Sequence, residues 1–145
     1  MIHFKTIDQA VENVLIKEKK SKFIGFAFPI FSIEEAKEKI TLIKKKHPSA
    51  NHHCYAYEVG INSSKKFRYN DDGEPNNSAG LPIHRQIQSL DITNTVVIIV
   101  RYFGGVKLGV GGLINAYKKT AKETLGSCNI KIVPITLEKQ LIFDY

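Results

Sequence analysis

The chain has 145 residues and a formal net charge of +7, and 43% of its residues are hydrophobic. This composition excludes a disordered chain, and the length fits one domain with a true core. No apolar run approaches the roughly 18 residues of a membrane span, and the N-terminus lacks the apolar segment of a signal peptide. The two cysteines, Cys54 and Cys128, are far apart and form no CxxC motif. We therefore expect reduced thiols and a cytoplasmic protein without a membrane partner.

The positive charge is compatible with an anionic partner such as RNA, DNA or the ribosome. All but three of the 21 basic residues are lysines, the exceptions being Arg68, Arg85 and Arg101. Nucleic-acid interfaces favour arginine because its guanidinium forms paired hydrogen bonds. Charge alone therefore favours a nucleic-acid partner only slightly.

The first half of the chain predicts a hairpin followed by a helix. Residues 11–20 and 22–30 are rich in β-formers and are separated by a short polar corner, which is typical of a β-hairpin. Ser32 and Glu35 form a capping box that begins a helix with apolar residues at helical spacing, and Pro48 ends it.

The middle of the chain predicts an antiparallel pair, a short helix and a central strand. Residues 51–60 and 66–70 are strand-like, and 71–80 is a loop by its turn residues. A short helix follows at 82–90, and the β-branched run of 94–103 predicts a buried central strand.

A helix over 112–126 and strand-like segments interrupted by Pro134 complete the chain. Strands and helices are mixed but do not alternate strictly. This order predicts an α+β sandwich in which a mixed sheet carries helices on one face.

The stretch RYFGGVKLGVGGLINAY, residues 101–117, holds five of the ten glycines between the predicted central strand and the last helix. Free N–H groups at a helix N-terminus favour an anion, and Arg101 and Lys107 flank the loop. The stretch nevertheless matches no phosphate fingerprint, because Val110 replaces the P-loop lysine and Ile114 replaces the third dinucleotide-binding glycine. An anion site and a tight corner that needs positive φ are equally compatible with this pattern.

Two other segments hold side chains capable of chemistry. Asp71, Asp72 and Glu74 could bind a metal or act as acid and base, but Asp-Gly turns are common, so the spacing favours a polar turn in which Asp71 is a cap. His52 and His53 are adjacent on a strand and point to opposite faces, so they cannot share one metal. With no nearby cysteine pair, we expect no zinc site.

Taken together, KKSKFI, HPSANHHCYAY, DDGEPNNSAGLPI and the glycine stretch closely resemble the YigZ/IMPACT family over roughly residues 11–126. The resemblance implies a fold like the second domain of a small-subunit ribosomal protein, a two-layer sandwich with a mixed or antiparallel sheet of about four strands backed by two helices. It also implies a link to translation control. Eukaryotic members act by protein contact on the amino-acid starvation response, and bacterial members lack a settled biochemical role.

The sequence departs from the family pattern in three places. Asn77 and Ser78 replace the usual Gly-Thr, and Asn115 replaces a basic residue, which weakens an interpretation as a nucleic-acid binder. Bacterial members also carry a ferredoxin-like second domain, of which ITLEKQLIFDY resembles only the first strand. We therefore expect one domain over 1–133 and a first strand or remnant of a second over 134–145.

The resemblance matches the glycines and the acidic loop position by position, and we expect both segments to meet at one end of the sheet. The glycines first serve the corner geometry, and the surface that they form is the candidate ligand or anion site, with no metal and no cofactor. The predicted site residues are His52, His53, Asp71, Asp72, Glu74, Arg101, Gly104, Gly105, Lys107, Gly109, Gly111 and Gly112.

Two functions follow from these observations. The first is a non-enzymatic, translation-associated regulatory module that contacts RNA, the ribosome or a protein regulator. The alternative is a small-molecule or phosphate-binding enzyme that uses DDGEP and the glycine loop, although Ser78 lies in no recognisable nucleophile elbow. We further expect the tail to be either disordered beyond about residue 136 or held in a homodimer contact that buries Phe143 and Tyr145.

Overall fold

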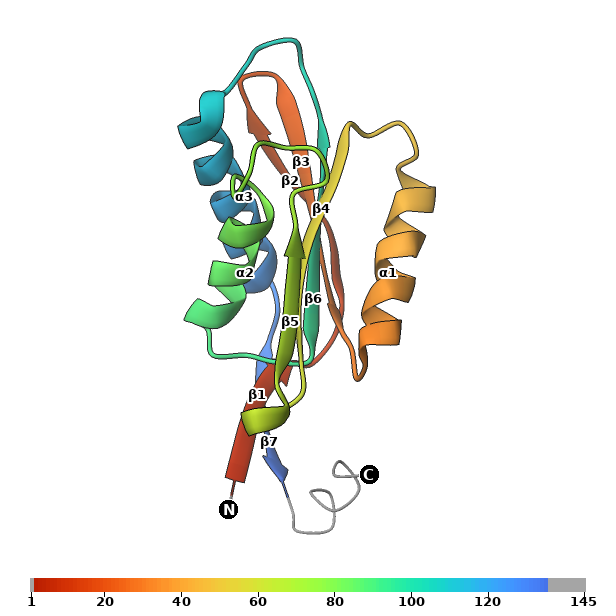
Figure 1. The fold of residues 1–145 in the computed structure, drawn as a ribbon, viewed down its shortest axis with the longest axis vertical. Helices are drawn as coiled ribbons and strands as arrows, with labels where there is room; N and C mark the ends of the chain where they lie inside the picture. Colours follow the sequence, from red (N-terminus) through yellow and green to blue (C-terminus); the bar gives the residue numbers. More distant parts are fainter. Residues whose placement is uncertain (1, 136–145) are drawn as a thin grey trace.

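The computed structural model describes residues 2–135, in which five strands form one antiparallel sheet between helices (Figure 1). The strand order is β2-β3-β6-β4-β5, so β6 lies at the centre and β2 and β5 lie at the edges. The strands of this sheet are β2 (Val11–Glu18), β3 (Ser21–Pro29), β4 (His52–Val59), β5 (Lys66–Asn70) and β6 (Thr95–Tyr102). The predicted hairpin, antiparallel pair and central strand are thus confirmed.

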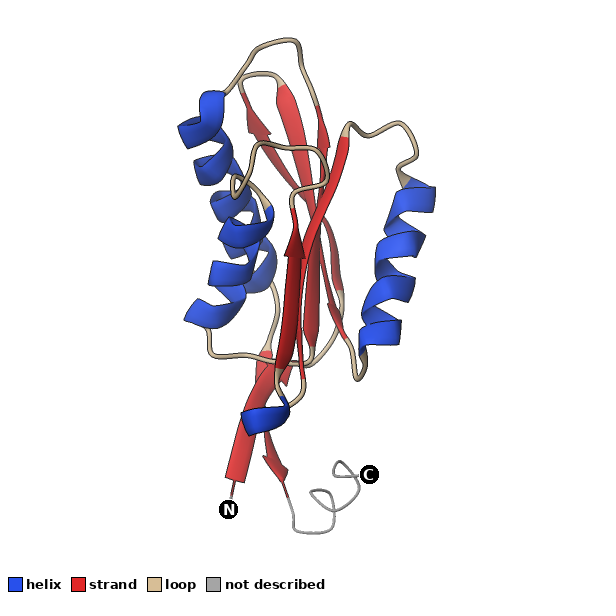
Figure 2. Cartoon of the chain, in the orientation of Figure 1, coloured by secondary structure: helices blue, strands red, loops and turns tan. Residues whose placement is uncertain are grey.

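The helices cover both faces of the sheet, which makes three layers (Figure 2). They are α1 (Ile33–Lys46), α2 (Gly80–Ser89) and α3 (Gly109–Gly126), and a 3-10 turn, η1 (Asn62–Ser64), connects β4 to β5. Helices α2 and α3 lie together on one face, and α1 lies on the other. The α+β class is confirmed, and of the mixed and antiparallel alternatives the sheet is antiparallel. The expectation of about four strands in two layers, backed by two helices, is corrected to five strands with α1 as a third helix on the opposite face.

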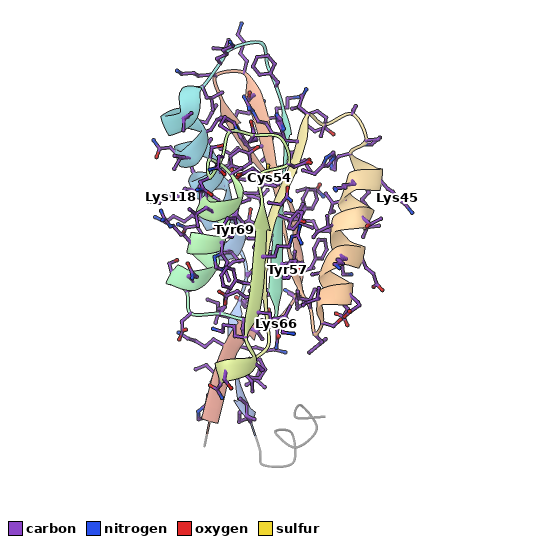
Figure 3. The ribbon with its side chains drawn as sticks, viewed as in Figure 1. Lys45, Cys54, Tyr57, Lys66, Tyr69 and Lys118 are labelled. Atoms are coloured by element: carbon purple, nitrogen blue, oxygen red, sulfur yellow. The ribbon has the colours of Figure 1, made fainter. Side chains whose placement is uncertain are left out.

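The reason for the third layer is that β6 is apolar on both faces. All residues from Thr95 to Arg101 are buried, so the sheet needs a cover on each side. Ala36, Ile40 and Ile43 of α1 supply one cover and belong to the same core cluster as Ile98. Lys45 of α1 and Lys118 of α3 then point away from the sheet on opposite sides of the molecule (Figure 3).

Ser32 begins α1 as the sequence predicts, with one change in the cap. The Ser32 Oγ accepts a hydrogen bond from the Glu35 N–H at 3.1 Å. The Glu35 carboxylate accepts from the Phe31 N–H, also at 3.1 Å, one residue earlier than in a standard capping box. Both bonds satisfy N–H groups at the helix start, which fixes where the helix begins.

A separate two-stranded ribbon lies at the end of the molecule opposite the glycine loop (Figure 1). It pairs β1 (Ile2–Ile7), which the sequence analysis missed, with β7 (Ile130–Ile135) in antiparallel register. Strand β7 crosses the predicted boundary between residues 133 and 134, which stays a prediction. The predicted tail contact falls on residues 136–145, outside the described residues. None of the helices within residues 2–135 is long and apolar enough to cross a membrane.

Candidate functional site

A buried ion pair joins the acidic loop to the end of the central strand. Glu74 is only 8% exposed, and Arg101 is 6% exposed. The Arg101 Nη1 donates to both carboxylate oxygens of Glu74 at 3.0 Å each, and the Tyr117 hydroxyl donates to Oε2 at 2.5 Å. The pair links a loop, a strand and α3 across 27 and 43 residues of sequence, so the carboxylate holds the three elements together.

The guanidinium of Arg101 is held on its other sides as well. The Arg101 Nη2 donates to the Ser21 Oγ at 3.3 Å. The Cζ of the guanidinium lies 5.5 Å from the ring centroid of Phe23 and 5.5 Å from that of Phe103. The positive charge at the foot of the glycine loop therefore already has an internal anion, Glu74. Arg101 was predicted to face an external anion, but in the structure its side chain lies beneath the surface.

The side chains near this pair that could act as nucleophiles are buried and donate hydrogen bonds within the protein. Burial raises the pKa of the Cys54 thiol, whose Sγ donates to the Asp71 carbonyl oxygen at 3.1 Å. Burial likewise raises the pKa of Tyr117, so its hydroxyl stays protonated and acts as a donor. The Ser78 hydroxyl is fully buried and donates to the Pro75 carbonyl at 2.6 Å. These groups serve the structure of the loop rather than attack on a substrate.

Two of the three carboxylates of DDGEP hold the backbone. The Asp71 carboxylate accepts hydrogen bonds from the N–H groups of Asn77, Ala79 and Gly80 at 2.8, 3.1 and 2.9 Å. This explains why α2 begins at Gly80, two residues before the predicted start. The Asp72 carboxylate accepts from the His53 N–H at 2.6 Å. Within residues 2–135, no three His, Cys, Asp or Glu side chains converge as metal ligands would.

The two adjacent histidines lie on opposite faces of β4, as predicted. The Nδ1 of His52 donates to the Asp72 carbonyl at 2.8 Å, because that carbonyl can only accept, and its Nε2 faces Glu74 Oε1 at 3.4 Å. The Nε2 of His53 instead donates to the His47 carbonyl at 2.7 Å. Only His52 therefore joins the buried pair.

The glycine loop is a corner that crosses the β2–β3 turn. A Cβ at Gly104 would lie 1.9 Å from the Lys20 carbonyl oxygen, so the two backbones meet there without room for a side chain. Gly105 and Gly109 adopt φ of +89° and +76°, which a side chain would strain. Helix α3 begins at Gly109, three residues before the predicted start, so Gly109, Gly111 and Gly112 lie in its first turn.

A cleft of ≈ 400 Å³ opens between the glycine loop and the buried pair. It is lined by Asn51, His52, Glu74, Pro75, Arg101, Phe103, Lys107, Leu108, Gly109, Val110 and Leu113. Of the predicted site residues, the cleft brings together His52, Glu74, Arg101, Lys107 and Gly109. Asp71, Asp72 and His53 do not line it, and the remaining glycines lie in the loop and helix turn around it.

Apolar side chains that line this cleft, or lie near it in the glycine loop and the start of α3, are open to solvent. Phe103, Val106, Val110 and Ile114 are 46%, 39%, 53% and 37% exposed. We call these four residues, with the first turn of α3, the glycine-loop surface. The sequence predicted neither these exposed apolar residues nor Tyr117 and Ser21 as partners of the ion pair. An inward-facing tyrosine needs a partner for its hydroxyl, and that was the signal that could have identified Tyr117.

Comparison with known proteins identifies relatives over most of the chain. The family model of the Impact N-terminal domain matches residues 19–125. IMPACT family member YvyE of Bacillus subtilis is 40% identical over 131 residues, which are 90% of this chain and 59% of that protein. The chain spans 52–59% of the length of the curated bacterial relatives that it matches.

Two solved structures share the fold. A crystal structure of a hypothetical protein superposes with a TM-score of 0.87 at 32% identity, covering 94% of this chain and 66% of that one. The two-domain translational regulator Yih1 superposes with a TM-score of 0.54 at 26% identity, covering 82% of this chain and 46% of that one.

Proposed function

Because this chain belongs to the IMPACT family, we propose that it is a translation-associated binding module that contacts a protein through the glycine-loop surface. One relative of the same fold, Yih1, is a translational regulator, which supports the general role.

The observation that carries the proposal is Gly111. It lies in the first turn of α3 with an ordinary helical φ, and a Cβ placed there would meet nothing within 4 Å. Alanine in a helix is more stable than glycine by roughly 0.5–1 kcal/mol, so the fold gains nothing from glycine here. A bare backbone at an exposed position allows another molecule to approach closely. Gly111 therefore fits a contact surface rather than a structural need.

The composition of the surface favours a protein over a phosphate group. Phe103 and Val110 line the cleft and are exposed, and Val106 of the glycine loop and Ile114 of α3 are exposed apolar side chains close to them in the sequence. Exposed apolar side chains that form a patch mark protein interaction sites. Lys107 lies among them and supplies a positive charge at the edge. An apolar centre with a charged border is the usual composition of a protein interface.

The floor of the cleft is suited to rigidity rather than catalysis. Glu74 and Arg101 neutralise one another, and the nearby Cys54 thiol and Ser78 hydroxyl are buried. The enzymatic alternative would need one of these groups to reach a substrate. Stabilisation of the fold by a nucleotide with magnesium in a thermal-shift screen would support that alternative, since a ligand that binds only the folded form raises the melting temperature.

RNA is the second candidate partner, and one feature favours it. Lys19 and Lys20 form the tip of the β2–β3 hairpin with φ of +44° and +68°, where asparagine and glycine are preferred. Lysine is unfavourable in this backbone conformation, so the turn itself does not explain the two lysines. Their positive charges beside Gly104 fit a contact with an anionic partner. Binding to RNA through these lysines would be independent of sequence and would fall steeply with salt.

Photo-crosslinking in a translating cell extract tests the proposal. A benzoylphenylalanine at Val110 should crosslink the full chain to a translation-associated protein, because Val110 is exposed and lines the cleft. The same group at Lys118, two turns further along α3 and pointing to solvent (Figure 3), is the matched control. Products that RNase removes would favour RNA, and equal crosslinking from both positions would contradict a protein contact at the glycine-loop surface.

A further inference from the structure

A second surface, unrelated to the glycine loop, lies along the open edge of the sheet at β5. This strand pairs with β4 on one side, and no other strand within residues 2–135 pairs with its outer side. An edge strand of this kind presents a row of free N–H and C=O groups that can pair with another extended chain.

The two edges of the sheet differ in how well they are protected. The register between β2 and β3 shifts between Val11 and Val14, and Asn13 has a φ of +61°, so that edge is bulged. A bulge twists an edge and interrupts pairing. The register between β4 and β5 is continuous from Lys66 to Asn70. The β2 edge is therefore interrupted by a bulge near its start, whereas the β5 edge is regular along its whole length.

The side chains of β5 divide by charge between the two faces of the sheet. Phe67 and Tyr69 lie on the α2 side, where their rings stack on His84 at centroid distances of 4.6 and 5.7 Å. Lys66 and Arg68 alternate with them and therefore lie on the α1 side, where Arg68 is opposite Tyr57. Tyr57 and Tyr69 mark the two faces in Figure 3.

The aromatic Phe67 on one face and the basic Lys66 and Arg68 on the other are all exposed, so a partner could contact them. Phe67 is 56% exposed although one side of its ring covers His84. Lys66 and Arg68 are exposed, and neither forms an ion pair with a residue of the described range. The edge thus offers an apolar contact on one face and two unpaired positive charges on the other.

We propose that β5 is a docking strand for an extended acidic segment of a partner protein, which adds to the sheet as a sixth strand. Acidic side chains of that segment lie opposite Lys66 and Arg68, and the apolar side chains between them lie beside Phe67. Main-chain hydrogen bonds supply the affinity and the alternating side chains supply the specificity.

Charge excludes a second copy of this chain as the occupant. An antiparallel pair of two β5 strands centred on Phe67 would place Lys66 of each copy opposite Arg68 of the other. Like charges directly opposite one another destabilise a strand pair. The same lysine and arginine that oppose self-pairing therefore select a partner of opposite charge.

A short peptide tests the docking strand directly. The probe is a fluorescein-labelled peptide of seven residues in which glutamate alternates with valine, titrated into the full chain at low salt. Amide NMR shifts should change at residues 66–70. The exposed Arg68→Glu exchange should weaken binding at least about tenfold, whereas Lys17→Glu on the bulged β2 edge should leave it unchanged within about twofold.

Main-chain pairing gives a readout that charge attraction alone cannot produce. Two further peptides carry N-methyl groups, one on every glutamate and the other on every valine. Because alternate N–H groups of a strand face the same neighbour, strand addition predicts that one of these peptides binds and the other does not. The proposal is overturned if both bind equally, if no peptide binds, if Arg68→Glu and Lys17→Glu behave alike, or if the NMR shifts fall outside β5 and its neighbours.

Discussion

Replacing Arg101 by methionine should lower the free energy of unfolding far more than a change at an exposed ion pair does. The exchange leaves the Glu74 carboxylate buried, with 3% of its side chain exposed, beside the Tyr117 hydroxyl and His52 alone. Removing one partner of a buried pair costs about 3–5 kcal/mol, because the remaining charge loses its compensation. For a chain of this length, about 3 °C per kcal/mol then gives a fall in Tm of about 10–15 °C.

Two controls separate charge burial from simple loss of packing. Lys46 and Glu12 form an exposed pair at 3.8 Å, so Lys46→Met should cost about 0–1 kcal/mol. The double change Glu74→Gln with Arg101→Met removes both charges, keeps an acceptor for Tyr117, and should recover most of the loss. Urea unfolding followed by circular dichroism measures all three. The reasoning is refuted if Arg101→Met costs no more than Lys46→Met, or if the double change recovers nothing.

The remaining predictions concern the loop, the thiols and pH. Gly104→Ala should destabilise the chain by several degrees in a thermal melt, because the added Cβ would meet the Lys20 carbonyl oxygen at 1.9 Å; an unchanged Tm would contradict that contact. Cys54 should resist Ellman's reagent at pH 8 until urea unfolds the chain, and Cys128, whose pKa burial raises to about 11, should react slowly; rapid labelling of Cys54 in the folded protein would refute its burial. Burial lowers the pKa of His84 from 6.5, so the unfolded chain binds the proton first and the free energy of unfolding should fall from pH 7 to pH 5. His84→Gln should flatten that slope, and an identical slope in the variant would count against the assignment.

Local sequence signals account well for the individual elements. The β-branched run of β6 and the polar corner of the β2–β3 hairpin each depend on neighbouring residues, and each was predicted. The local cap of α1 by Ser32 was predicted as well, whereas the cap of α2 depends on a contact of longer range. The start of α2 was predicted two residues late because its cap comes from Asp71, nine residues before Gly80. The third layer was missed because periodicity says which face of α1 is apolar but not which side of the sheet it covers.

In the candidate site, too, the residues could be identified from the sequence, but their contacts with distant parts of the chain could not. The resemblance selected Glu74, Arg101 and the glycines, but each residue alone suggested a solvent-facing role. Only the fold shows that Glu74 and Arg101 neutralise each other beneath the surface. The strand character of β7 was predicted, although the strand continues through Pro134, but β1 and its pairing with β7 were missed because the two strands pair across almost the whole described chain.

Gly111 provides the most direct test of the glycine-loop surface as a protein contact. Gly111 and Gly126 both lie in α3 with ordinary φ and open space, so alanine at either should leave the fold intact or slightly more stable. The measurement is the yield of the Val110 crosslink in a translating extract, with each alanine variant compared at equal concentration. Gly111→Ala should lower the yield by at least about fivefold, since a methyl group blocks close approach, while Gly126→Ala should leave it unchanged. Equal yields from both variants, with both proteins folded, would contradict a protein contact at the glycine-loop surface.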